Sequence, residues 1–257
     1  MKIIRRSALS AFVGLLLFTV GSFAAEPPAG GLLDKVWTII PKKGSEVKFD
    51  KAFAEHVQWR RDHKDPWTWE VYVEVDGPET GAYFARSGNH NWSDFDAYDA
   101  SDFSAQAGAH WNATMAPHVG EIRSSMSQYL PDISQWPNDA PEYQLFQLIT
   151  YRIKQGQHRN FTSAAGALAD ALKEAKWPYH WAFMDHQSGQ LPSVLLVLPS
   201  LKWADMAEPN PNVFQAVANV RGQEKAGQMF DAYSATLART DAVVVRRLPT
   251  LAVTGAK

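Results

Sequence analysis

The chain has 257 residues, of which 46% are hydrophobic, and its 25 basic and 27 acidic residues leave a formal net charge of −2. This balanced charge, with both signs scattered along the chain, argues against a nucleic-acid partner. Because the chain has no cysteine, disulfides, thiolate metal sites and cysteine nucleophiles are excluded, and the fold must be stabilised by its core alone.

Residues 1–24 have the pattern of a secretory signal peptide. A basic start is followed by an apolar run from residue 8 to 20 and by the small-residue cleavage site Ser22-Phe23-Ala24. Residues 25–35, rich in glycine and proline, are expected to be a linker. We therefore expect a periplasmic or secreted protein with no stable membrane insertion after cleavage.

The rest of the chain contains one unit twice. Shifting residues 36–77 by 112 positions places them on residues 148–189 with identical amino acids at seven positions. These pairs are Thr38/Thr150, Lys42/Lys154, Gly44/Gly156, Phe49/Phe161, Pro66/Pro178, Trp69/Trp181 and Gly77/Gly189. The match predicts a tandem repeat of residues 36–136 and 141–252.

Each copy is expected to have the element order βαββαβ. A strand at 36–41 or 145–153 is followed by an amphipathic helix that ends at a proline. The later elements are two hairpin strands (67–75 and 81–87, or 179–187 and 193–198), a second helix (near 103–116 or 213–238) and a closing strand (near 125–130 or 243–248). This order defines the ferredoxin-like unit, a four-stranded antiparallel sheet with both helices on one face.

The second helix is preceded in the two copies by Trp92-Ser93-Asp94 and Trp203-Ala204-Asp205. With this motif and this element order, the chain resembles the dimeric α/β-barrel superfamily, fused in tandem. The resemblance implies an α+β fold in which two tandem ferredoxin-like βαββαβ units form an intramolecular α/β barrel. It also implies a monomer, because the second copy covers the sheet face that single-copy relatives bury by dimerising. The superfamily includes cofactor-free monooxygenases, isomerases, haem-binding chlorite dismutases and dye-decolorizing peroxidases, so the fold does not choose the function.

The second strand of each copy offers candidate site residues. In the strand at 67–75 the apolar odd-numbered residues, Trp69 among them, are expected to pack beneath the helices, and the alternate residues to face the barrel interior. Trp181 is expected to be buried in the same way in the second copy. The inward row includes Glu70, Tyr72 and Glu74 in the first copy and His180, Met184 and His186 in the second, joined by Arg86 and Arg152 from neighbouring strands.

Two interpretations of this row stay open. The row can form a structural network, because buried charges are usually paired, or it can bind a ligand. A metal site is not expected, because His180 and His186 lie six residues apart on one strand, roughly 20 Å, too far to chelate one ion. His110 and His118, which flank the second helix of the first copy, are more typical of exposed or capping histidines than of haem ligands. No cofactor is expected.

Two functions are compatible with this row. The preferred hypothesis is an exported binding or accessory protein whose barrel encloses a small-molecule ligand, contacted by Tyr72 and Met184 and anchored by the ionisable side chains. The alternative is a cofactor-independent oxygenase or isomerase, in which His180 or His186 takes a proton from an acidic C–H and an arginine of the row holds the oxyanion. The first is preferred because the row is acidic in one copy and imidazole-bearing in the other, so no catalytic set is duplicated.

Overall fold

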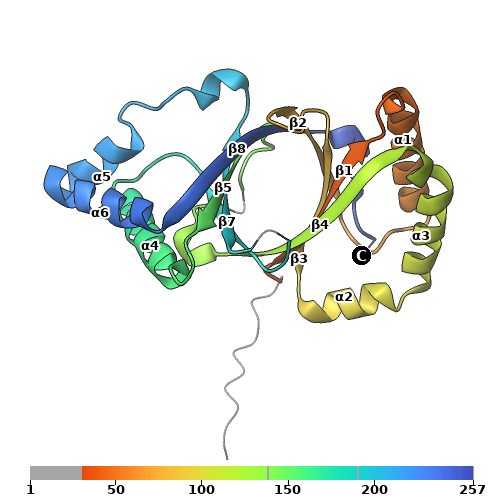
Figure 1. Ribbon diagram of the computed structural model, residues 1–257, viewed down its shortest axis with the longest axis horizontal. Helices are drawn as coiled ribbons and strands as arrows, with labels where there is room; N and C mark the ends of the chain where they lie inside the picture. The colour runs from red at the N-terminus through yellow and green to blue at the C-terminus, as the bar shows by residue number, and fades with distance from the viewer. Residues whose placement is uncertain (1–30, 138, 190, 257) are drawn as a thin grey trace, which may run out of the picture.

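The computed structural model describes residues 31–137, 139–189 and 191–256. The described residues form a closed eight-stranded barrel with helices packed on two opposite sides (Figure 1). The expected signal peptide and most of the expected linker lie outside the described residues. Within the described part of the chain, every helix is too short or too polar to cross a membrane.

The two repeats have the same element order. The first consists of β1 (Leu33–Pro41), α1 (Glu46–Asp62), β2 (Glu70–Asp76), β3 (Tyr83–His90), α2 (Trp92–Asp99), α3 (Asp102–Thr114) and β4 (Val119–Tyr129). The second consists of β5 (Leu145–Ile153), α4 (His158–Glu174), β6 (Ala182–His186), β7 (Ser193–Ser200), α5 (Val213–Arg221), α6 (Gln223–Ala235) and β8 (Leu237–Arg247). Short 3-10 helices lie at Ala116–His118, Pro131–Ile133, Trp203–Met206 and Pro249–Leu251.

The 112-residue shift found in the sequence relates the first elements of the repeats. β1 and β5 have nine residues each, and α1 and α4 have 17 each. The turns before the two helices contain Gly44 and Gly156, whose φ angles are +78° and +76°. Glycine adopts this left-handed conformation without a steric penalty, so the identity at these positions preserves the turn. β1 begins at Leu33, inside the segment expected to be linker.

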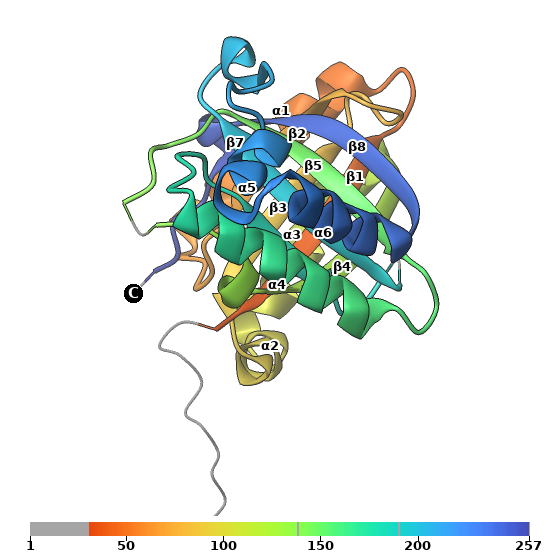
Figure 2. The ribbon, with the colours of Figure 1, turned by 90° about the vertical axis from the view of Figure 1, so that its left-hand side faces the viewer.

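The strand order confirms the expected fold. It is β4-β1-β3-β2 in the first repeat and β8-β5-β7-β6 in the second, the order of ferredoxin-like units. Two seams between the repeats close the barrel: Tyr72 of β2 pairs with Arg247 of β8, and Ser127 of β4 pairs with His186 of β6. Figure 2 shows α4, α5 and α6 packed on the outer face of the second repeat's sheet.

The main apolar cores lie between each sheet and its own helices. Phe49 and Phe161, a matched pair of the repeat, are both fully buried. Trp69 and Trp181 are buried in the two clusters, with exposed fractions of 7% and 4%, as the alternation of the strands predicts. Burial of an unpaired donor is costly, and each indole N–H has a hydrogen-bond acceptor. Trp69 donates to Asp65 Oδ2 at 3.0 Å, and Trp181 donates to the carbonyl of Ile133 at 2.8 Å.

The shared Trp-x-Asp motif has a structural role. The Asp94 carboxylate accepts a hydrogen bond from the backbone N–H of Asn91 at 2.7 Å, and Asp205 accepts one from Lys202 at 3.2 Å. In both repeats, therefore, an acidic side chain in the first turn of a helix accepts a hydrogen bond from the backbone N–H of the residue that precedes the helix. The motif marks the start of a helical segment.

Candidate functional site

Three of the expected site residues meet inside the barrel. The Arg86 guanidinium donates from Nε to Asp34 at 2.6 Å and from Nη1 to Glu70 at 2.7 Å. The Tyr72 hydroxyl also donates to Glu70, at 3.1 Å, and Arg247 Nη2 lies 3.5 Å from the same carboxylate. Asp34 and Arg247 were not foreseen. Since these groups bond to one another, this part of the inward row is better described as a structural network than as an open ligand site.

Other members of the expected row serve separate parts of the barrel. Glu74 is buried and accepts a hydrogen bond from the backbone N–H of Glu79 at 2.7 Å, which holds the turn between β2 and β3. At the end of β6, His186 Nδ1 lies 3.1 Å from Ser193 Oγ, and burial lowers the pKa of this imidazole. Met184 is buried on the same strand, with an exposed fraction of 6%.

The structure does not bring the two predicted histidine bases together. His180 precedes β6, which begins at Ala182, and its Nδ1 lies 2.5 Å from the Tyr143 hydroxyl. Arg152 lies on β5 opposite Ser193, where its charge adds to the effect of burial in lowering the pKa of His186. Arg152 therefore lies near one of the two histidines, and Arg86 belongs to the network around Glu70.

A cavity of about 590 Å³ lies on the opposite face of the first repeat's sheet, between the strands and α1, α2 and α3. Figure 1 shows these helices on the right-hand side of the barrel. The volume and the composition of this cavity are typical of small-molecule sites, which are mostly apolar with a few convergent polar groups. The aromatic side chains that line it are Trp37, Phe53, Trp67, Trp69, Trp92, Phe95, Tyr98 and Trp111.

His56 of α1 is a buried polar group on the wall of this cavity. It lines the cavity yet is only 2% exposed. Its Nε2 lies 3.3 Å from Arg60 Nη1, and its Nδ1 lies 2.9 Å from His110 Nδ1. Burial, together with the charges of Arg60 and His110, lowers the pKa of His56 to about 3. The imidazole is therefore neutral at physiological pH.

Arg60, one helical turn after His56, fixes the polar end of the cavity. Its Nε donates to Asp65 Oδ2 at 2.6 Å, and its Nη2 donates to the Tyr98 hydroxyl at 2.6 Å. Its guanidinium also lies 5.0 Å from the centre of the Trp69 ring, within range of a cation–π contact. Burial raises the pKa of Tyr98 to about 12. One arginine thus holds a neutral imidazole and a protonated phenol on the wall of one apolar cavity.

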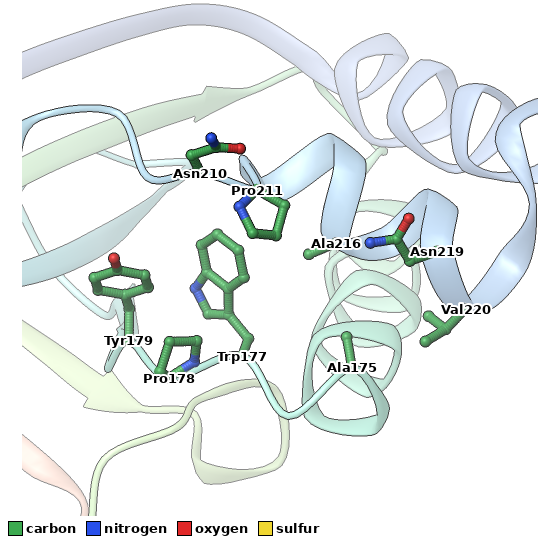
Figure 3. Close-up of a pocket in the computed structure, with 9 residues that line it drawn as sticks. All are labelled: Ala175, Trp177, Pro178, Tyr179, Asn210, Pro211, Ala216, Asn219 and Val220. Carbon is green, nitrogen blue, oxygen red and sulfur yellow. The ribbon is translucent and has the colours of Figure 1, made fainter.

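The second repeat lacks these groups. The 112-residue shift places Leu168 at the position of His56 and Leu172 at that of Arg60, and both leucines belong to the apolar core. Its smaller pocket, of about 200 Å³, lies between the segment after α4 and α5. Figure 3 shows Trp177 beside Tyr179 in this pocket, with no charged or histidine side chain among the nine residues that line it. The chemistry of the site is therefore confined to the first repeat.

This comparison of α1 with α4 is the sequence signal that could have identified the site. The apolar stripe of α4 runs through Leu168 and Leu172, whereas α1 has a histidine and an arginine at the same positions. A polar residue at a position that packing makes apolar in the other copy needs a partner or a function. The inward row of β2 does not indicate this site, because the cavity lies on the other face of that sheet.

The site does not fit a haem group, which some proteins of this fold bind. Haem iron binds directly to an imidazole nitrogen. His56 is the only histidine among the described residues that line the cavity, and iron bound at its Nε2 would place a metal cation next to the positive Arg60 guanidinium, which lies 3.3 Å from that nitrogen. Elsewhere in the described residues, no three histidine, aspartate or glutamate side chains are grouped so that they could hold a metal ion.

The fold is that of the dimeric α/β-barrel proteins, with the two ferredoxin-like halves in one chain. A protein from Lactobacillus acidophilus provisionally classed as a monooxygenase has a TM-score of 0.53 at 10% identity, over 88% of this chain and 97% of its own. An anthrone oxidase-like protein gives 0.51 at 9%, over 84% and 91%. Chlorite dismutase from Candidatus Nitrospira defluvii gives 0.52 at 8%, over 86% and 92%. No family model matches the chain, and no curated protein matches it in sequence.

Proposed function

We propose that the protein is an enzyme of the cofactor-independent oxygenase or isomerase type, acting on a flat aromatic carbonyl compound with an acidic C–H bond. The observation that carries this proposal is the buried His56, held neutral beside Arg60 and Tyr98 in an aromatic cavity. A deeply perturbed titratable group in a cleft is a frequent mark of a catalytic site.

The preferred hypothesis from the sequence, a protein whose function is to bind a ligand or to act as an accessory, is wrong. The solved structures with this fold include proteins described as monooxygenases, an anthrone oxidase-like protein and chlorite dismutases, all of them enzyme classes. The enzymatic alternative agrees better with them. We assign its catalytic roles to other residues: His56 takes the place of His180 and His186 as the base. Tyr98, held by Arg60, takes the place of Arg86 and Arg152 in stabilising the oxyanion.

The geometry supports a division of labour between base and oxyanion donor. His56 is neutral and can accept a proton at Nε2, because its contact with Arg60 at 3.3 Å is long. Tyr98 accepts a hydrogen bond from Arg60, so its own O–H remains able to donate to a substrate oxygen. Since burial keeps this phenol protonated, it can stabilise the enolate that forms when the C–H proton leaves.

The aromatic lining favours a planar substrate, and an oxygenase reaction follows from the enolate. An enolate can reduce O₂ directly, so the protein needs only to form the carbanion, hold it and exclude water. For anthrone the balanced reaction is anthrone plus O₂ giving anthraquinone plus water. If the natural substrate does not react with O₂ after enolisation, the same groups would instead return the proton to another carbon, and the enzyme would be an isomerase.

The test is the oxidation of anthrone, which is measured as oxygen consumption and as the increase in anthraquinone absorbance. We expect His56→Leu, which installs the residue of the second repeat, to lower kcat/KM by roughly 10²- to 10⁴-fold, and Tyr98→Phe by roughly 10²- to 10³-fold. His186→Gln, away from the cavity, serves as the control. If the His56 variant kept the wild-type rate while His186→Gln lost it, the site would lie inside the barrel and this proposal would fail.

The location of the protein is also part of the proposal. We propose that the enzyme acts after export, because residues 1–24 have the composition of a cleaved signal peptide. Mass spectrometry of the protein secreted or released from the periplasm should give a chain that begins at Ala25. A mature chain that retains Met1 and stays in the cytoplasm would contradict export.

A further inference from the structure

The contact between His56 and His110 has a direction. A guanidinium nitrogen can only donate, so the Arg60 contact assigns the acceptor role to His56 Nε2 and leaves the proton on Nδ1. His56 Nδ1 therefore donates to His110 Nδ1 over 2.9 Å. His110 then has its own proton on Nε2. The two rings form an ordered hydrogen-bonded pair, with the donor on the buried side.

His56 alone would bind an additional proton only weakly. Its ring is almost wholly buried, and the positive Arg60 lies 3.3 Å from Nε2, the nitrogen assigned as the proton acceptor. An imidazolium at this position would lose its hydration and would also be repelled by the Arg60 charge. Both effects agree with the low pKa of His56. A base at this position works only if a second proton leaves as the first arrives.

His110 is well placed to take that second proton. It lies on α3 and is partly exposed, unlike His56. Its ring is stacked on Trp59 with 4.8 Å between the ring centres, and Trp59 is stacked in turn on His63 at 4.1 Å. This stack fixes the plane of the His110 ring, and the residue is partly exposed. The pair thus connects the interior of the cavity with the surface between α1 and α3.

We propose that His110 is a proton-relay residue, which accepts the Nδ1 proton of His56 while His56 Nε2 accepts the proton of the substrate. The proposal rests on the proposed function. In the forward step the substrate C–H bond breaks, its electron pair stays on the enolate, and the proton is bound by His56 Nε2. The former Nδ1 proton moves to His110 Nδ1, and the Nε2 proton of His110 can pass to water. His56 remains neutral throughout.

The relay also accounts for the return of protons. In the conversion of anthrone to anthraquinone, two protons leave the same carbon and two are added to the oxygen that departs as water, while O₂ accepts the electrons of the substrate. A proton that comes back through His110 and His56 to the reduced oxygen restores both imidazoles to their starting tautomers. No further reductant or cofactor enters this balance.

Chemical rescue tests the relay. His110→Ala should lower anthrone turnover by about 10²-fold, and added imidazole should restore it, because a free imidazole can occupy the vacated space. His110→Phe fills that space and should lose the same activity without rescue. His118→Ala, which removes a partly exposed histidine that neither lines the cavity nor belongs to the stack, is the matched control and should retain turnover.

The outcomes separate this proposal from the proposed function. If His56→Leu abolishes turnover and His110→Ala keeps it, the relay is refuted while the function stands. If His56→Leu keeps turnover, the proposed function fails, and the relay with it. Nitrogen NMR of the histidine-labelled protein gives a readout that needs no substrate: we expect the proton on Nδ1 of His56 and on Nε2 of His110. The opposite tautomers would overturn the relay.

Discussion

Replacing Asp65 by asparagine should destabilise the protein strongly, although the side chain keeps its size. The Asp65 side chain is fully buried, with an exposed fraction of 0%. It accepts hydrogen bonds from Arg60 Nε at 2.6 Å, from the backbone N–H of Trp67 at 2.9 Å and from Trp69 Nε1 at 3.0 Å. The substitution removes the negative charge and leaves the Arg60 guanidinium, 16% exposed, without its counterion.

The expected cost follows from this geometry. Removing one partner of a buried ion pair costs roughly 3–5 kcal/mol. The asparagine oxygen can still accept one hydrogen bond, and Arg60 keeps its contact with Tyr98, so the low end, about 3 kcal/mol, applies. For a chain of this size each kcal/mol lowers Tm by roughly 2–4 °C, which gives a decrease of about 6–12 °C.

Thermal and denaturant unfolding of three variants would test the reasoning. Asp62→Asn changes an exposed aspartate three residues away and should leave the free energy of unfolding almost unchanged. The double variant Arg60→Leu, Asp65→Asn removes both charges and should recover a large part of the loss, since a missing pair costs less than a broken one. If Asp65→Asn has the same Tm as the wild type, the ion pair does not stabilise this end of the cavity.

Three further predictions concern the two repeats. Replacing Trp69 or Trp181 by alanine should cost roughly 3–5 kcal/mol each in denaturant unfolding, and a loss in only one repeat would contradict the shared packing. The unfolded chain protonates His56 near pH 6.5 and the folded chain only near pH 3, so this contribution to stability is present above pH 6.5 and is lost as the pH falls. His56→Leu should therefore reduce the loss of stability between pH 7 and pH 5 by up to about 2 kcal/mol. Light scattering should give the mass of one chain, because the barrel closes within it; an obligate dimer would refute the predicted monomer.

Sequence alone was sufficient for the architecture because the repeat is recorded in residues with local structural roles. Gly44 and Gly156 have the same left-handed conformation, and Trp69 and Trp181 have the same place beneath a helix. Alternation along β2 also assigned Glu70 and Tyr72 correctly to the barrel interior. These features depend on neighbours in the chain or on the period of a strand, and one sequence displays both.

The site was harder to predict because its groups meet only through tertiary packing. His56 and His110 belong to different helices, and the register between α1 and α3 cannot be read from either helix alone. An apolar cavity has no sequence motif of its own either, since the residues that line it are the same types that fill a core. Asp65 contributes through a loop, where no periodicity indicates which way a side chain points.

The closed barrel has a consequence for synthesis of the chain. β2 and β4 form the two edges of the first sheet, and their partners β8 and β6 both belong to the second half. Until the ribosome has passed His186, both edges of the N-terminal half therefore expose unpaired backbone groups, which can template association with another chain. The β2 edge stays unpaired until Arg247 has been added. Pairing of Tyr72 with Arg247 must also wait for residues far along the sequence, and contacts of this range form slowly. Chains truncated in the second repeat should consequently aggregate, whereas the finished barrel leaves neither edge exposed.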